Sequence, residues 1–318
     1  MKGIAVVISF LTWSVTMGQT YFKMEDNYKC SWTNYYPSAN LASVQPVRAE
    51  LINAIFDSIS RRSAIEFNYP QGGCQQRAEI MSLILSKMYN IDHARIWLFS
   101  PQDLDPTRKE RLFIYDKNGW SANDTIYWGY HVAPVVLVRQ ANGIDTLVLD
   151  PSLERMRPLH LNEWFARIGN SGISSYTFLQ KDKYFFNNQP KAGGGYTSAI
   201  DGCFYEYVGA AVNNLVMEKG LAVNDLAVII HDKYIRPMET STSTDAAALA
   251  GLKAIFGNAT VMDYLFAQNS SGATDATTLR YAFAHYQAIM VDARTIYDQR
   301  LAYWTGISDQ LLGCLNCH

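Results

Sequence analysis

Cys74 occupies a position that suits a reactive thiol. It follows Gly72 and Gly73 and comes just before residues 75–89, whose apolar side chains recur with helical spacing. The first turn of a helix carries unpaired backbone amides and the positive end of the helix dipole, and both favour a thiolate. Glycines there let a substrate approach the backbone, and the amides could hold an oxyanion. On position alone, a buried or disulfide-bonded cysteine is an equally good interpretation.

His131 and Asp150 are the other candidates, and each is weak evidence when taken alone. His131 lies within residues 126–139, a run rich in aromatic and β-branched residues that predicts a strand. Asp150 ends the next predicted strand, residues 144–149, and a proline follows it. A single histidine in a strand is more often structural than catalytic, and an aspartate before a proline is commonly a turn residue.

A predicted hairpin relates these two residues. The turn at residues 140–143 sets Arg139 opposite Ile144, and counting along both strands then sets His131 opposite Ser152. A turn that differs by one residue would break this pairing.

This register places Asp150 two residues from the partner of His131, on the same face and within reach of its side chain. We therefore expect Asp150 to orient His131, and His131 to activate Cys74 where the hairpin packs on the helix. A nucleophile, a base and an orienting acid together suit acyl-transfer chemistry.

The residues around the three groups resemble a known family. Residues 73–78, 128–133 and 150–153 are similar, in the same order, to bacterial protein-glutamine deamidases (protein glutaminases) of the papain-like and transglutaminase-like superfamily. The resemblance extends over roughly residues 64–180. It implies that Cys74 is the nucleophile, His131 the general base and Asp150 its partner, and that no cofactor is needed.

The sequence departs from this resemblance in two places. Glu79 stands where members of the family carry a histidine, a change that would affect the substrate pocket or the surroundings of the helix. The region after Tyr196 has no counterpart in the family.

The spacing of apolar residues predicts an α+β fold, in which a central helix that bears the cysteine packs on an antiparallel sheet, as in transglutaminase-like and papain-like enzymes. The predicted strands are residues 94–99, 111–115, 126–139, 144–149 and 175–180, and the predicted helices are residues 47–62, 75–89 and 162–168.

A second, mainly α-helical region is predicted after a Gly- and Asn-rich stretch at residues 187–195. Its predicted helices are residues 203–219, 225–234, 244–256, 261–267 and 277–304. We therefore expect a catalytic domain at residues 20–190 and a helical accessory domain at residues 196–318. A length of 318 residues suits two domains.

The amino terminus predicts export from the cytoplasm. Lys2 precedes an apolar stretch, residues 4–15, which is too short to span a membrane, and small or polar residues follow it. We expect residues 1–19 to be a signal peptide, and the mature protein to be secreted or periplasmic.

Cysteine and histidine spacing does not favour a metal or haem cofactor. The chain has five cysteines, so at least one is unpaired in an oxidising compartment or bonded to another chain. Residues 314–318 match the C-x-x-C-H pattern of haem attachment, but we expect a local disulfide or a chance match there. The six histidines never show metal-ligand spacing with one another. We expect Cys314 and Cys317 to be structural, with Cys30 and Cys203 as a second candidate pair.

The expected reaction is hydrolysis of the γ-carboxamide of protein-bound glutamine, through a thioester on Cys74. A transglutaminase or a cysteine peptidase with the same three residues is one alternative, and a secreted binding protein with a vestigial triad is another. The expected partner is a protein or peptide with an exposed glutamine. Lys plus Arg (27) nearly balance Asp plus Glu (29), which argues against a nucleic-acid partner.

Overall fold

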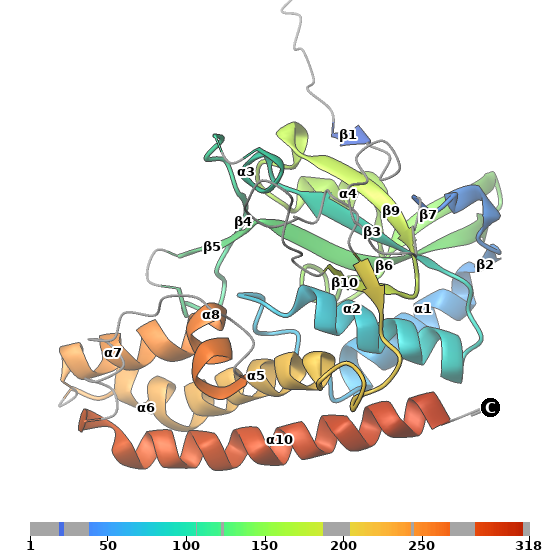
Figure 1. The fold of residues 1–318 in the computed structure, drawn as a ribbon. Helices are drawn as coiled ribbons and strands as arrows, with labels where there is room; N and C mark the ends of the chain where they lie inside the picture. Colours follow the sequence, from blue (N-terminus) through green and yellow to red (C-terminus); the bar gives the residue numbers. More distant parts are fainter. Residues whose placement is uncertain are drawn as a thin grey trace, which may run out of the picture.

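Runs of β-branched and aromatic residues in the first part of the chain form the main sheet (Figure 1). The computed structural model describes residues 19–21, 38–105, 107–121, 124–186, 204–242, 245–267 and 284–313. In these residues the main sheet has seven strands, in the order β1-β9-β3-β6-β7-β8, and β2 pairs with β6. The strands are β1 (Thr20–Tyr21), β2 (Val47–Arg48), β3 (Ala94–Phe99), β6 (Tyr130–Gln140), β7 (Gly143–Val148), β8 (Leu159–His160) and β9 (Ser175–Gln180). All pairs are antiparallel except β1 with β9 and β2 with β6.

Two short antiparallel ladders stand beside this sheet. They pair β4 (Leu112–Tyr115) with β5 (Thr125–Trp128), and β10 (Lys183–Phe186) with β11 (Phe204–Glu206). The single strand predicted at residues 126–139 is therefore wrong, because β5 and β6 belong to different ladders. They meet at Gly129, where a side chain would crowd a carboxylate oxygen of Asp103 at 3.0 Å.

Helix α2 (Cys74–Leu83) lies at the centre of the molecule, and nine of its ten residues are buried. This confirms the central helix expected from the sequence. Helix α1 (Ala49–Asp57) lies beside it on the same face of the sheet (Figure 1). Both continue into π-helical turns, Ser58–Arg62 and Ile84–Met88. The short helix α3 (Pro101–Leu104) follows β3, and α4 (Leu161–Ala166) packs its aromatic side chains on the opposite face of the sheet.

Helices dominate the described residues after β11, as predicted. They are α5 (Val216–Ile230), α6 (Arg236–Glu239), α7 (Ala246–Phe256), α8 (Ala259–Met262) and α10 (Gln287–Gly313). The helix predicted at residues 203–219 is wrong over most of its length. Residues 204–206 of this segment form strand β11, because they pair with β10, and helix α5 starts only at Val216.

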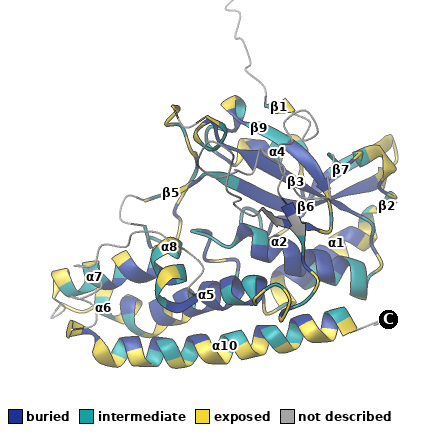
Figure 2. Ribbon diagram, viewed as in Figure 1, coloured by how far each residue is buried: buried dark blue, intermediate teal, exposed yellow. Residues whose placement is uncertain are grey.

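One hydrophobic cluster extends from α1 and α2 to α5, α7 and α10. Helix α5 lies between α2 and α10, and it is buried along most of its length, whereas α10 exposes one side (Figure 2). The predicted division between residues 190 and 196 stays a prediction, since residues 187–203 lie outside the described part of the chain.

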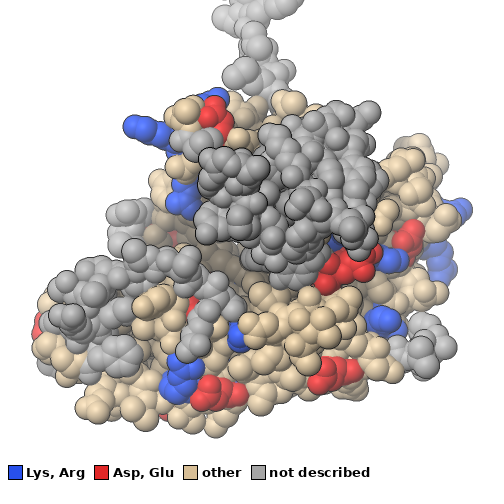
Figure 3. Space-filling view, viewed as in Figure 1, with Lys and Arg blue, Asp and Glu red and all other residues tan. Residues whose placement is uncertain are grey.

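The surface carries charges of both signs. On the face drawn in Figure 3, basic and acidic side chains of the described residues are interspersed between uncharged areas. Among the helices that the structure describes, none combines the length and the apolar character needed to cross a membrane.

Candidate active site

Cys74 is the first residue of α2, as the sequence predicted, and its thiol is free and buried. Gly73 precedes it in the left-handed conformation, with φ 75° and ψ 17°, which suits a residue without a Cβ. No side chain caps this helix end, so its first backbone amides are not taken by a cap. The thiol donates a hydrogen bond to Oε1 of Gln75, at 3.3 Å.

The hairpin of β6 and β7 has the predicted register, with Arg139 opposite Ile144. The expected continuation to His131 opposite Ser152 is wrong, because the ladder ends at Val148. The chain beyond Val148 turns, and amides of residues 153 and 154 donate to the Asp150 carbonyl oxygen at 3.1 and 3.0 Å.

His131 and Asp150 nevertheless meet. Nε2 of His131 lies 2.7 Å from Oδ2 of Asp150, and both side chains are buried. This leaves Nδ1 of the ring for another partner. That atom is buried and has no hydrogen bond within the described residues.

Asp150 is held by three groups besides His131. The indole Nε1 of Trp164 donates to Oδ2 at 2.8 Å, and the hydroxyl and amide of Ser152 donate to Oδ1 at 2.5 and 3.2 Å. Burial alone would raise the pKa of Asp150. The charge of His131 and the hydrogen bonds from His131, Ser152 and Trp164 outweigh burial, and the pKa of Asp150 lies below its ordinary value.

His131 is fixed between two indole rings, which pack on it nearly in parallel. The ring centroid of Trp128 lies 4.5 Å away at an interplanar angle of 10°, and that of Trp164 lies 5.7 Å away at 18°. Burial opposes the charged form of the imidazole, but the charge and hydrogen bond of Asp150, together with the nearby Cys74, raise the pKa of His131 to about 9. The site therefore favours an imidazolium.

Cys74 approaches His131 from the helix layer. Both residues line one narrow space together with Ala78, Leu149 and Asp150. Alternation along β6 directs His131 to the face of the sheet that Trp164 covers, whereas α2 lies on the other face. The thiol and the ring therefore line the same space at the edge of β6, beyond the last pair of β6 and β7.

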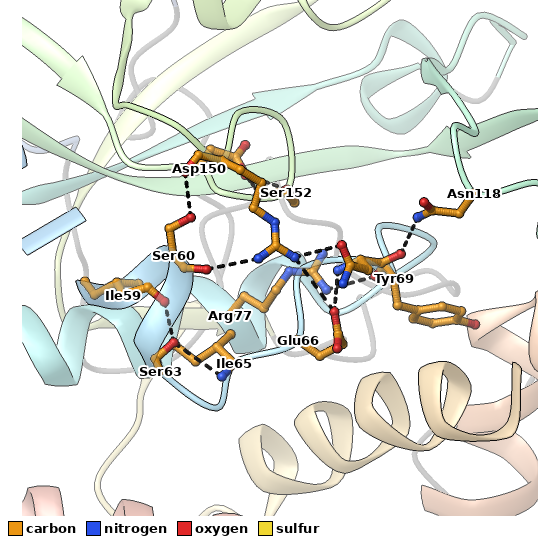
Figure 4. Close-up of polar contacts among 12 residues, drawn as sticks. Ile59, Ser60, Ser63, Ile65, Glu66, Tyr69, Arg77, Asn118, Asp150 and Ser152 are labelled. Atoms are coloured by element: carbon orange, nitrogen blue, oxygen red, sulfur yellow. Dashed lines mark hydrogen bonds and ion pairs between the residues drawn. The ribbon is translucent and has the colours of Figure 1, made fainter. Parts of the chain in front are cut away.

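Arg77 adds a positive charge that sequence reasoning did not assign a role. Its side chain is buried, and Nη1 donates to the Tyr69 carbonyl oxygen at 3.1 Å, below the turn of Asp150 and Ser152 (Figure 4). Burial lowers the pKa of Arg77, while the nearby Cys74 and Asp150 raise it and only partly offset burial. One turn of helix separates Arg77 from Cys74, and this spacing was the available signal.

Trp164 is the other group that sequence reasoning missed. The helix that carries it was predicted, but nothing in its sequence marked the indole as a donor to Asp150.

A cleft opens beside the turn that follows Asp150. Its volume is about 610 Å³, and it shares Phe67 and Ser152 with the space that Cys74 and His131 line. Apolar and basic side chains predominate on its walls, including Phe113, Tyr115, Lys117, Arg155 and Arg167.

Glu79, which departs from the family resemblance, affects the surroundings of the helix. It is buried, and Oε2 lies 2.6 Å from Nη2 of Arg95 on β3. Burial raises the pKa of Glu79 to about 7, although Arg95 opposes this shift. Arg95 also donates to the Ser82 hydroxyl at 3.0 Å. Glu79 does not line the space at Cys74.

The described residues contain no group of three or more histidine, cysteine or acidic side chains that could hold a metal ion. The expected signal peptide, residues 1–19, and the four other cysteines lie outside these residues, apart from residue 19.

Residues 52–168 match the model of a protein family described as glutaminase. This segment contains Cys74, His131 and Asp150, and it ends well before α5. No curated relative matches the chain significantly.

Among solved structures, the chain is similar to the NMR structure of protein-glutaminase from Chryseobacterium proteolyticum, at 20% identity over 58% of this chain and 89% of that chain, with a TM-score of 0.39. A crystal structure of protein-glutaminase is 23% identical over 49% of this chain and 81% of that chain, with a TM-score of 0.35. A mutant of pro-protein-glutaminase is 22% identical over 65% of this chain and 63% of that chain, with a TM-score of 0.40.

Proposed function

We propose that the protein is a cysteine-dependent deamidase of glutamine side chains in proteins, because residues 52–168 match the model of a glutaminase family. Cys74 is the nucleophile, and His131 is the general acid and base. Asp150 orients His131 and stabilises its protonated form. The observation that carries this proposal is the 2.7 Å contact between His131 and Asp150, beside a buried free thiol at the start of a helix.

The first half of the reaction forms a thioester. The Cys74 thiolate attacks the carboxamide carbon of glutamine, and the backbone amides at the start of α2 receive the oxyanion. The carbon–nitrogen bond then breaks, and Nδ1 of the imidazolium gives its proton to the departing ammonia. A ring charged at neutral pH is ready for this step, because Asp150 and Cys74 raise the pKa of His131 to about 9.

The second half releases glutamate. His131, now neutral, takes a proton from water, and the oxygen of that water attacks the thioester carbonyl. The carbon–sulfur bond breaks and restores the thiolate. One water is consumed and one ammonia is released for each glutamine, and no external cofactor takes part.

The cleft beside Ser152 suits a protein substrate. Its volume of about 610 Å³ is large enough for several side chains, and it shares Phe67 with the space at Cys74. We propose that the chain segment next to the target glutamine lies there.

We also propose that the enzyme acts outside the cytoplasm, after removal of residues 1–19. The support is the charged, apolar and small-residue pattern of that segment.

The test is an assay on a glutamine-rich soluble protein that measures ammonia and newly formed glutamate together. We expect equal amounts of both from the wild type, and none from Cys74→Ala or His131→Ala. The matched control is His160→Ala, because His160 makes the same 2.7 Å contact to an aspartate, Asp145, at the surface. Equal loss in His160→Ala would contradict the assignment.

A second arm of the assay adds an excess of a primary amine. Deamidation predicts that glutamate still forms and that little amine is incorporated. Efficient incorporation of the amine without matching glutamate would identify a transglutaminase, and peptide-bond cleavage would identify a peptidase.

A further inference from the structure

The turn that presents Cys74 is in direct contact with the C-terminal helices. A Cβ added to Gly73 would lie 2.4 Å from Nδ2 and 2.8 Å from Oδ1 of Asn224 on α5. A Cβ added to Gly72 would lie 2.6 Å from Cβ of Ala259 on α8. Such distances leave no room for a side chain, so the two helices pack on the backbone of this turn.

Asn224 is buried in the middle of α5, with 2% of its surface exposed. Its Nδ2 has no hydrogen-bond partner among the described residues. A buried donor without a partner is unfavourable, so a hydrogen bond from Nδ2 does not explain the presence of this side chain. The side chain of Asn224 therefore acts on Gly73 by filling the space beside it, and not through a hydrogen bond.

The same face of α5 makes a second close contact with α2. Gly220 lies one turn before Asn224, and a Cβ there would lie 2.5 Å from Cγ of Gln76. The next residue, Asp225, lies about 100° around α5 and anchors the helix to α10, because its Oδ2 accepts from Arg300 and Trp304, each at 2.6 Å. Helix α5 is thus fixed to α10 and packed against the start of α2.

From these contacts we propose that Asn224 is a positioning residue for Cys74. It occupies the space beside Gly73 and keeps this flexible residue in its left-handed conformation, so that the thiol and the first amides of α2 stay in place. Asn224 of a C-terminal helix then positions the nucleophile, although the glutaminase family match ends at residue 168. The proposal rests on the function proposed above for Cys74.

The test compares Asn224→Ala, which removes the contact, with Asn224→Leu, which restores a branched side chain of similar size without its amide. We expect Asn224→Ala to lower kcat roughly 10- to 100-fold with KM changed little, because a small misplacement of a nucleophile has an effect of this size. Asn224→Leu should recover most of kcat. Loss of kcat in both variants would show that the amide acts through a hydrogen bond and would overturn the proposal.

The matched control is Leu226→Ala, a buried truncation about 200° around α5 from Asn224. It should lower the thermal midpoint and leave kcat within about twofold of the wild type. An equal fall of kcat in Asn224→Ala and Leu226→Ala would show that only stability matters, and would also overturn the proposal.

Alkylation of Cys74, followed by mass spectrometry of its peptide, separates this proposal from the proposed function. Its rate should change in Asn224→Ala and return toward the wild-type rate in Asn224→Leu, whether or not glutamine is the substrate. A wild type that releases no ammonia would refute the deamidase. An alkylation rate that is the same in all variants would refute the positioning role. If Asn224→Ala does not fold, Asn224→Ser replaces it, with the same expected outcomes.

Discussion

Replacement of Asp150 by asparagine removes one negative charge from the site and keeps the size of the side chain. The carboxamide oxygen can take the place of Oδ2, which accepts from His131 at 2.7 Å and from Trp164 at 2.8 Å. The new amide nitrogen then faces the backbone N–H of Ser152, which donates to Oδ1 at 3.2 Å in the wild type. The variant therefore loses the charge and one hydrogen bond, but not the orientation of the imidazole.

The expected magnitude follows from the pKa of His131. Burial lowers this pKa, yet Asp150, with a smaller contribution from Cys74, raises it from 6.5 to about 9. The difference corresponds to up to about 3 kcal/mol in favour of the charged ring. Without the charge of Asp150, burial prevails and the pKa of His131 falls below 6.5.

The sign of the pH dependence is defined by this shift. The pKa of His131 is higher in the folded protein than in the unfolded chain, so protonation of His131 stabilises the fold. This stabilisation is fully present below pH 6.5 and is lost as the pH rises through about 9. Asp150→Asn should therefore lower the free energy of unfolding by about 3 kcal/mol near pH 6 and by much less above about pH 9. If the same interaction acts in the transition state, kcat/KM should fall roughly 10²-fold.

Urea unfolding of the wild type and of Asp150→Asn, at about pH 6 and about pH 9.5, measures this difference. The exposed pair of Asp145 and His160 supplies the control, since Asp145→Asn should change stability by less than about 1 kcal/mol at either pH. A stability difference for Asp150→Asn that is independent of pH, or larger at the higher pH, would refute the reasoning.

Three further replacements test individual contacts. Trp164→Phe keeps an aromatic ring beside His131 but removes the 2.8 Å donor to Asp150, so we expect a loss of about 1.5–3 kcal/mol in urea unfolding; an unchanged midpoint would contradict this. Gly73→Ala should lower the free energy of unfolding by about 1–3 kcal/mol, because the new Cβ is strained at a φ of 75° and crowds Asn224. A stabilising effect would show that the turn relaxes freely. Arg95→Leu leaves Glu79 buried without its partner and should lower stability by about 3–5 kcal/mol, most of which Glu79→Leu in the same chain should restore. Calorimetry of both variants checks this, and failure of the double variant to recover would contradict it.

Local sequence patterns predicted the central helix and strands β3, β7 and β9, but not the short strands β1, β2 and β8 of the main sheet. The predicted bounds of β3 and β9 agree with the structure, and α2 begins within one residue of the predicted helix. These segments have strong periodicity and clear ends. The register of β6 with β7 was also predictable, because a short turn leaves little freedom of pairing.

Tertiary contacts determined what the sequence could not predict. The apolar spacing of residues 203–219 is helical, but residues 204–206 pair with β10, and periodicity within one segment does not reveal such a pairing. The turn after Val148 brings Asp150 to His131 by a route that the hairpin register did not include. The donor Trp164 and the contact of Asn224 with Gly73 both join segments distant in sequence, so no local pattern reveals them.

The sharing of one hydrophobic cluster by α1, α2, α5 and α10 has a consequence for how the molecule opens. Segments that share a core unfold together, so the backbone amides of α2 and α5 should exchange with solvent deuterium at similar slow rates, through one cooperative opening. A fragment that ends before α5 would leave one side of α2 exposed to water. The helix that carries the thiol is therefore expected to depend for its order on chain segments more than a hundred residues further along.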